Sequence, residues 1–415
     1  MALVFHSGFE SGNGAEWAAF SGSAAASTTQ KKTGAYALRC NPTAGAGYAY
    51  ISNITVCKLS FYIFIASSGT PDAETSILGA SGGSAIARIR LTTDRHLKIV
   101  DGAGNTLRAT SNGVLSEAVW TRISVALDTT NDKYYLWING VIDSSINGVT
   151  SDAAITSWSI QFGIGDSCTA DIYFDDYIAD GASGTTDLGD IRCAAVALPN
   201  AEGDSIAFDT LAPTSPTTHY TKYDDPAGGI DDADYVMHAA KTEVQDFANL
   251  NSSVEIGLAG SDVIDAVNVC VRMKMSKATA GSPGITVKDN GTAYDTTLGA
   301  SNDAFTWLKV YYATMPNGGA AWTQTRFDAF QAGGNSSAAA EDTYMSAVMV
   351  FVAYHTSGTA WTKNLADTMT LSDSTVKEPV KKPADTLTLL DSFSRIADYA
   401  RTFTDTLTLV DAPVK

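Results

Sequence analysis

Carboxylates are the most abundant reactive side chains in this sequence of 415 residues, and their spacing decides whether they could cleave a glycosidic bond. A retaining glycosidase needs two carboxyl groups about 5 Å apart on one face. The first 180 residues hold four glutamates without that spacing: Glu10, Glu16, Glu74 and Glu117. Asp171, Asp175 and Asp176 share one strand-like segment, where structural and turn positions are the favoured interpretation. The sequence therefore predicts no catalytic residues and a protein that is not an enzyme.

Other residues that bind metals or act as nucleophiles are scattered. The five histidines form neither an HxH nor an HExxH spacing, which argues against a transition-metal site: His6, His96, His219, His238 and His355. The five cysteines contain no CxxC pair, which favours buried free thiols and folding in a reducing cytoplasm. Asp231–Asp234 lacks the glycine and the terminal glutamate of an EF-hand loop, so we interpret it as a solvated turn.

Aromatic side chains are the residues that could bind sugars, because a sugar ring stacks on an exposed aromatic face. Trp120, Tyr135 and Trp137 are the candidates for glycan binding, and they lie on strand-like segments. Aromatic residues also fill the faces of a β-sheet by default. A position in the core of a sandwich therefore stays open as the alternative for each ring.

The charge balance limits the partners. Acidic residues outnumber basic ones 45 to 27, which gives a net charge of −18. A chain this acidic repels phosphate groups, so no nucleic acid is expected as a partner. The longest apolar runs, Leu59–Ala66 and Ala347–Tyr354, are too short for a membrane helix of about 20 residues, and no membrane contact is expected. The first dozen residues also lack the basic start of a secretory signal.

Alternating patterns predict a mainly β fold class. Of the acidic residues 36 are Asp, which favours turns, and 35 glycines accompany them. Apolar and polar residues alternate in Ala87–Leu91, Thr121–Leu127 and Tyr134–Ile138, as in strands with two different faces. Asn139-Gly140 then predicts a tight hairpin turn. We predict an N-terminal antiparallel β-sandwich.

Several segments of this region resemble one family of sandwiches. Trp120–Asp128 with Tyr135–Gly140 looks like the central hairpin of laminin-G/concanavalin-A-like jelly rolls. Phe9–Gly12 and Gly34–Leu38 are similar to the start of such modules, and Asp171–Ile178 resembles their closing strand. The resemblance implies a jelly roll over residues 1–182.

The same resemblance implies a structural calcium ion. Such jelly rolls often bind one between an early acidic residue and the closing strand. Transferred to this sequence, the ligands would be Glu10 with Asp175 or Asp176, and hard carboxylate oxygens suit calcium. No other cofactor is expected.

A second β-rich domain is predicted over residues 190–358, after a linker at Gly181–Gly189. Strands are expected at Cys193–Leu198, Val263–Met275, Ile285–Val287, Thr306–Ala313 and Ser346–Tyr354. Ala320–Phe330 is predicted to be one helix that buries Trp322, Phe327 and Phe330 and ends at Gly333-Gly334. Its motifs resemble a domain that recurs in tailed-phage virion proteins: Gly203-Asp204, Tyr220, Asp231–Val236 and Pro316–Trp322.

Residues 361–415 are predicted to form an extended tail with a threefold repeat. Asp367–Leu371, Asp385–Leu389 and Asp405–Leu409 are copies of one Asp-Thr-(Leu/Met)-Thr-Leu unit, and an Asp follows two residues after each. Such short strands need a partner surface. We predict that leucines of these units mediate assembly: Leu371, Leu387, Leu389, Leu407 and Leu409. Similar tails occur in phage structural proteins.

Three functions remain to be compared. The resemblances favour a tailed-phage virion structural protein, such as a decoration, fibre or tail component. It would be made in the host cytoplasm, located in the virion, and assembled with itself and with other virion proteins. The alternative is a glycan-binding host-attachment module whose partner is a host surface glycan. A polysaccharide-degrading enzyme is disfavoured because the carboxylate pair is missing.

Overall fold

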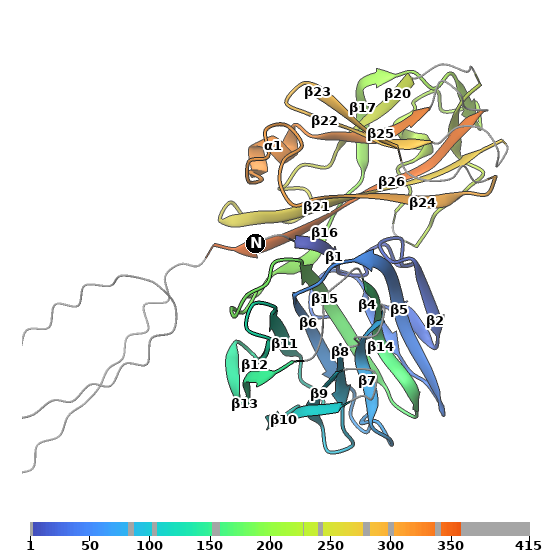
Figure 1. Ribbon diagram of the computed structural model, residues 1–415. Helices are drawn as coiled ribbons and strands as arrows, with labels where there is room; N and C mark the ends of the chain where they lie inside the picture. The colour runs from blue at the N-terminus through green and yellow to red at the C-terminus, as the bar shows by residue number, and fades with distance from the viewer. Residues whose placement is uncertain are drawn as a thin grey trace, which may run out of the picture. The chain divides into compact units, whose positions relative to one another are not determined.

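Antiparallel β-sheet dominates the described part of the chain (Figure 1). The computed structural model describes residues 3–81, 87–101, 106–151, 158–226, 228–239, 244–276, 283–297, 303–336 and 342–357. The mainly β fold class is confirmed. The tail repeats, with Leu371, Leu387, Leu389, Leu407 and Leu409, lie outside the described residues. Within the described residues, no helix is long and apolar enough to cross a bilayer.

Two sheets form a first sandwich. One consists of β13 (Val141–Thr150), β12 (Lys133–Ile138), β11 (Thr121–Asp128), β6 (Lys58–Ile65), β15 (Ile172–Asp180), β4 (Ala37–Cys40) and β3 (Ala24–Ser27), with β1 (Leu3–Ser7) paired to β15. The other consists of β10 (Thr106–Val114), β9 (His96–Asp101), β8 (Ala87–Leu91), β7 (Thr75–Ser81), β14 (Trp158–Cys168), β5 (Gly45–Ile54) and β2 (Ala19–Gly22). The chain passes repeatedly between the two sheets, as it does in jelly rolls.

The alternating residues of these strands separate the core from the outer face. On β11, Ile123 and Val125 point into the core, and Arg122 and Ser124 lie on the outer face. The predicted turn follows β12, where Asn139 has a φ of 51° and Gly140 a φ of 80°. Two positive φ values in succession are typical of the turns that match the twist of a hairpin.

Two further sheets form a second sandwich. One consists of β18 (Thr210–Ala212), β19 (Tyr235–His238), β26 (Thr343–Thr356), β21 (Asp262–Met275) and β24 (Thr306–Tyr312), with β16 (Arg192–Ala197) paired to β26. The other consists of β17 (Pro199–Ile206), β20 (Val244–Leu250), β25 (Gln331–Ser336), β22 (Gly284–Asp289) and β23 (Thr292–Thr297). A 3-10 turn spans Tyr220–Lys222. The predicted domain boundaries at 182 and 190 stay predictions, since Met1–Thr359 pack as one compact unit.

The helix of the second sandwich is shorter than predicted. Only α1 (Gln324–Asp328) is helical, because Thr323 is extended and its Oγ1 accepts a hydrogen bond from Arg326 N, which caps the first turn. The predicted apolar residues Trp322, Phe327 and Phe330 are all buried in the core of this sandwich.

The glycine pair expected to end the helix lies inside a strand instead. Gly333 belongs to β25, where it pairs with Phe247 of β20. A β-carbon at Gly333 would overlap the backbone of Asp246. The strand therefore uses glycine to approach its neighbour closely, and this requirement cannot be seen in the local sequence.

The two sandwiches share a small apolar cluster. Its buried members come from both sandwiches and from the linker: Leu3, Ile178, Leu188, Ile191, Cys193, Ala266 and Ala353. Cys193 N also donates a hydrogen bond of 2.6 Å to Asp176 Oδ1, and Gly228 N donates one of 2.8 Å to Ser11 O. These contacts hold the edges of the two sandwiches close together.

Candidate functional site

The three aromatic residues predicted to bind glycan lie on the outer face of the first sandwich, in two separate groups. Tyr135 and Trp137 stack with ring centroids 6.1 Å apart on β12. Trp120 packs 5.4 Å from Phe64, just before β11 begins. Trp137 pairs with Ser124 of β11, and Ser124 lies four residues after Trp120 in the chain. The three rings therefore form no continuous platform.

Two segments of the chain cover the middle of this outer face. Lys32 places its ammonium 4.7 Å from the ring of Tyr62. From the linker, Asp187 pairs with Arg122 at 2.6 Å, and Asp190 accepts a hydrogen bond of 2.7 Å from Tyr62 Oη. Glycan binding by Trp120, Tyr135 and Trp137 stays a prediction.

The predicted calcium ligands hold one loop through its backbone. Glu10 accepts hydrogen bonds from Ala35 N at 2.8 Å and Tyr36 N at 3.3 Å. Asp175 Oδ2 accepts from Lys32 N at 2.7 Å and from Thr33 N at 3.2 Å. The second acid of the closing strand, Asp176, accepts from Thr33 Oγ1 and from Cys193 N. The three carboxylates therefore anchor residues 32–36 to the sandwich.

Burial shapes the charge of this acidic cluster. It raises the pKa of Glu10 to about 8 and that of Asp176 to about 6. The pKa of Asp175 is also raised, by burial and by the neighbouring Asp176. The donor oxygens are of the type that calcium prefers, but no three metal-binding side chains converge among the described residues. The calcium ion stays a prediction.

Several of the remaining reactive groups of the described residues have structural partners. Asp171 forms a two-point ion pair with Arg39, at 2.9 Å for both contacts. Asp246 is fully buried and accepts hydrogen bonds from Tyr223 Oη at 3.0 Å and from His219 Nδ1 at 2.8 Å, and this contact raises the pKa of His219. All five cysteines are free and buried, which confirms their predicted state.

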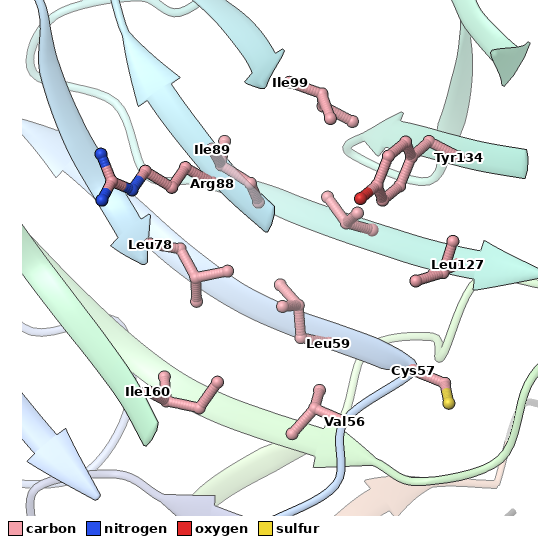
Figure 2. A pocket seen from close by; sticks show the side chains of 11 residues that line it. Val56, Cys57, Leu59, Leu78, Arg88, Ile89, Ile99, Leu127, Tyr134 and Ile160 are labelled. Carbon is pink, nitrogen blue, oxygen red and sulfur yellow. The ribbon is translucent and has the colours of Figure 1, made fainter. Parts of the chain in front are cut away.

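A small cavity lies between the sheets of the first sandwich. Figure 2 shows the side chains that line it, which are mainly aliphatic and include Leu59, Leu78, Ile89 and Ile160. Its volume is about 40 Å³, which is close to the share of one water molecule in the liquid, about 30 Å³. The cavity is too small and too apolar to hold a sugar.

A much larger groove of about 700 Å³ lies where the two sandwiches meet. Its walls are two edge strands, β2 of the first sandwich and β24 of the second. Edge strands present backbone N–H and C=O groups that no neighbouring strand takes up. The groove is lined by Asn13, Gly14, Trp17, Ala18, Ala19, Phe20, Ile51, Ser52, Arg272, Phe305, Thr306, Trp307, Leu308 and Lys309.

Aromatic rings form much of this lining. Phe20, Phe305 and Trp307 are partly exposed. Trp17 is a buried support: its ring stacks 5.9 Å from that of Phe162, and its Nε1 donates a hydrogen bond of 2.9 Å to Ser7 Oγ. The Lys309 ammonium donates to the Trp17 carbonyl, so one hydrogen bond joins the two walls.

Arg272 is held in a fixed position at the mouth of the groove. Its Nε and Nη2 donate to the two oxygens of Asp232, both at 2.7 Å, and Arg272 lowers the pKa of that carboxyl group. Asp232 also accepts a hydrogen bond from Ser346 Oγ. The guanidinium carbon lies 5.8 Å from the ring of Trp307 and 5.9 Å from that of Phe305. Asp232 belongs to the turn Asp231–Asp234, for which the sequence predicted only a solvated position.

The row of cations and rings continues along the outer face of the sheet. Lys274 Nζ lies 4.5 Å from the ring of Phe305 and 4.7 Å from that of Tyr344. A third ring, that of Tyr235, lies 5.9 Å from the same ammonium. We call Trp307, Arg272, Phe305, Lys274 and Tyr344 the cation–aromatic stripe.

Comparisons with known proteins give only partial likenesses. No family description and no curated protein matches the sequence. Among solved structures, the Trypanosoma rangeli sialidase is 12% identical over 39% of this chain, with a TM-score of 0.29, and the match covers 27% of the sialidase. Domain 4 of an extracellular arabinanase from Geobacillus stearothermophilus, in complex with arabinotriose, is 16% identical over 44% of this chain and 95% of its own, with a TM-score of 0.32. A carbohydrate-binding module from Bacillus subtilis is 9% identical over 34% of this chain and 86% of its own, with a TM-score of 0.25.

Proposed function

We propose that this protein is a non-enzymatic carbohydrate-binding protein and that the groove between the two sandwiches holds the glycan. The observation that carries this proposal is the lining of the groove, which joins the partly exposed rings of Phe20, Phe305 and Trp307 to the polar groups of Asn13 and Arg272. Sugar rings have apolar faces that stack on aromatic side chains and hydroxyl groups that need hydrogen-bond partners. The two edge strands add backbone partners of both kinds.

The size of the groove fits an oligosaccharide. Ligand pockets commonly measure about 300–1,000 Å³, and the groove has about 700 Å³. It is open to solvent between β2 and β24, which leaves room for a polymer that extends beyond the groove. This openness favours binding to a chain at an internal position.

The lining also supports binding without turnover. General acid–base catalysis needs a positioned carboxyl, imidazole or similar group near the scissile bond. Among the described residues that line the groove there is no Asp, Glu, His or Cys. The carboxylates of Asp171, Asp175 and Asp176 are engaged elsewhere, with Arg39 and with backbone amides.

A glycan array probed with the full chain, followed by calorimetry on the best ligand, tests the proposal. Replacing Trp307 by alanine removes a large stacking surface, and we expect affinity to fall about tenfold, because burying ~60 Å² of apolar surface contributes about 1.5 kcal/mol. Trp120→Ala is the matched control, since it removes the same side chain from the outer face of the first sandwich. We expect that control to bind like the wild type.

The four outcomes other than the expected one are separable. Loss of binding in Trp120→Ala with retention in Trp307→Ala would assign the glycan to the residues predicted from sequence. Loss in both would assign it to both surfaces, and loss in neither would overturn the groove. Failure of the wild-type chain to bind any glycan would overturn the proposed function.

A role in a phage particle is the second proposal, and the three copies of the Asp-Thr-(Leu/Met)-Thr-Leu unit favour it. Repeated short strands gain stability by adding to the sheet of another subunit. In that setting the tail would join the protein to other virion proteins or to its own copies, and the groove would serve attachment to a host surface glycan. Truncation of the tail tests this proposal, as described below.

A further inference from the structure

We propose that the groove and the cation–aromatic stripe select acidic glycans, meaning polymers whose sugars carry carboxylate groups. The inference rests on the proposed function and names the class of ligand for the same site. It is carried by the placement of Arg272 and Lys274 between aromatic rings, where Asp232 pairs with one edge of Arg272 and leaves its other edge free among the described residues.

The cations at the groove contrast with the charge of the chain. Acidic residues exceed basic ones by 18 in the sequence, so an average surface patch repels an anion. Among the described residues, the cations that line the groove are Arg272 and Lys309, and Lys274 adjoins it through Phe305. Asp232 balances the charge of Arg272, so Lys274 and Lys309 are the two cations for which the described part of the chain supplies no carboxylate in an ion pair. A cleft lined by one sign of charge focuses the field and raises the local concentration of ligands of opposite charge.

Arg272 is prepared for a planar anion. Asp232 takes its Nε and one hydrogen of Nη2, and a guanidinium has five N–H donors in one plane. Among the described residues no further partner takes the remaining three donors, so they are left for a ligand. Because Asp232 fixes the orientation, little side-chain freedom is lost when a carboxylate pairs with the remaining edge.

Lys274 supplies a second positive charge at a fixed distance. Arg272 and Lys274 are two positions apart on β21, so their side chains lie on the same face of the sheet and their Cα atoms are about 7 Å apart. The rings of Phe305 and Tyr344 lie 4.5 and 4.7 Å from the ammonium and restrict its movement. A polymer with recurring carboxylates can contact both cations while its sugar faces pack on the rings between them.

Lys309 has a different role from these two cations. Its ammonium donates to the Trp17 carbonyl, and burial lowers its pKa. It joins the walls of the groove and is a positioning residue for the site.

Single-stranded nucleic acid is the other polyanion that combines charge with flat rings. The net charge of −18 opposes binding to a polymer with a charge on every unit. The stripe offers two cations, Arg272 and Lys274, separated by rings, which suits a polymer of lower charge density. Oligothymidylate is therefore included as a competing probe.

Calorimetry on the full chain tests the inference with four probes: oligogalacturonate, oligosialate, the carboxyl-reduced form of the oligogalacturonate, and oligothymidylate. We expect one of the two acidic sugars to bind at least tenfold more tightly than the reduced form, and raising the salt concentration to weaken that binding. Lys274→Gln should weaken it about fivefold, the effect of one partly exposed ion pair. Arg272→Lys should also weaken it, since lysine keeps the charge but cannot pair with two oxygens at once.

Lys288→Gln is the matched control, because Lys288 pairs with Asp204 on the other sheet of the second sandwich. It removes the same charge away from the groove and should leave affinity unchanged. Equal binding of acidic and reduced probes, or an unchanged affinity in Lys274→Gln, would overturn the inference while the proposed function stands. Tighter binding of oligothymidylate than of either acidic sugar would also overturn it. If no glycan binds, charged or neutral, both the inference and the proposed function fail.

Discussion

Replacing Gly34 by alanine tests how tightly Glu10 is packed against the loop of residues 32–36. Gly34 has a φ of +60°, and a β-carbon built there would overlap the carboxyl group of Glu10. Glu10 is 4% exposed, so its side chain cannot move into solvent without breaking the bonds to Ala35 N and Tyr36 N. The substitution should therefore destabilise the first sandwich through two separate effects.

The size of each effect follows from the geometry. A left-handed conformation costs an alanine about 1–2 kcal/mol. Displacing Glu10 leaves buried hydrogen-bonding groups without partners, which costs a further ~1–3 kcal/mol. Gly319→Ala is the matched control: its φ is +65°, and a β-carbon there would meet no atom within 4 Å. We expect Gly34→Ala to lower the free energy of unfolding by about 2 kcal/mol more than Gly319→Ala does.

Differential scanning calorimetry of the full chain measures this difference. For a sandwich of this size, about 2 kcal/mol corresponds to a melting temperature about 4–8 °C lower. Repeating both substitutions in a Glu10→Ala background completes a double-mutant cycle, in which the extra cost of Gly34→Ala should largely disappear. Equal costs for the two glycine substitutions, or an extra cost that persists without Glu10, would refute the steric argument.

Three further predictions concern metal, catalysis and assembly. If Glu10 with Asp175 or Asp176 holds calcium, a chelator should lower the melting temperature of the first sandwich. Removing free calcium that was a hundredfold above its Kd corresponds to a loss of ~2.7 kcal/mol in the free energy of unfolding. A melting temperature that changes neither with chelator nor in Glu10→Gln would rule out the calcium site. Purified protein should release no reducing sugar from common polysaccharides, and turnover that is abolished by Asp171→Asn, Asp175→Asn or Asp176→Asn would contradict a non-enzymatic role. Truncation after Ser357 should leave both sandwiches folded but weaken self-association or incorporation into a particle, measured by analytical ultracentrifugation and particle occupancy. Leu387→Asp with Leu407→Asp should have the same effect, because it places charge in apolar pockets, whereas equal assembly of all three chains would exclude the tail as an assembly element.

Strands with two different faces could be predicted from sequence. Ala87–Leu91 is β8 with the predicted bounds, and β11 and β12 each extend their predictions by one residue. In these segments one face packs on the core and the other does not. Apolar and polar residues therefore alternate along the strand, and this alternation can be recognised in the sequence. The long strands β21 and β26 were also predicted, because each contains a run of mainly apolar residues that no glycine or proline interrupts.

Elements whose residues serve distant contacts were missed or misjudged. The strand β25 contains Gly333-Gly334, which by local rules ends a helix. It is a strand because its backbone must approach Asp246 closely, and that neighbour is almost ninety positions away in the sequence. Strands β17 and β20 were absent from the prediction for a similar reason, since their polar residues Glu202 and Asp246 accept hydrogen bonds from His219, next to the 3-10 turn.

The groove could not be predicted, because its lining comes from four separate parts of the chain. Trp17 and Phe20 precede β5 of the first sandwich, whereas Arg272 and Trp307 lie on β21 and β24 of the second. One local signal was present. Arg272 and Lys274 stand at alternate positions of β21 among the apolar residues Val271, Met273 and Met275, which indicates a charged, partly exposed face at that end of the strand.

The groove exists only where the two sandwiches are joined, so ligand binding and the stability of the junction depend on the same contacts. The walls are edge strands of different sheets, so neither sandwich contains the site alone. Their separation is fixed by the shared apolar cluster around Ile178 and Ala353, by Cys193 N on Asp176, and by Lys309 on the Trp17 carbonyl. A ligand that contacts Phe20 on one wall and Trp307 on the other adds to these contacts only in the joined state. Ligand binding must therefore stabilise the junction by the same free energy that the junction contributes to binding.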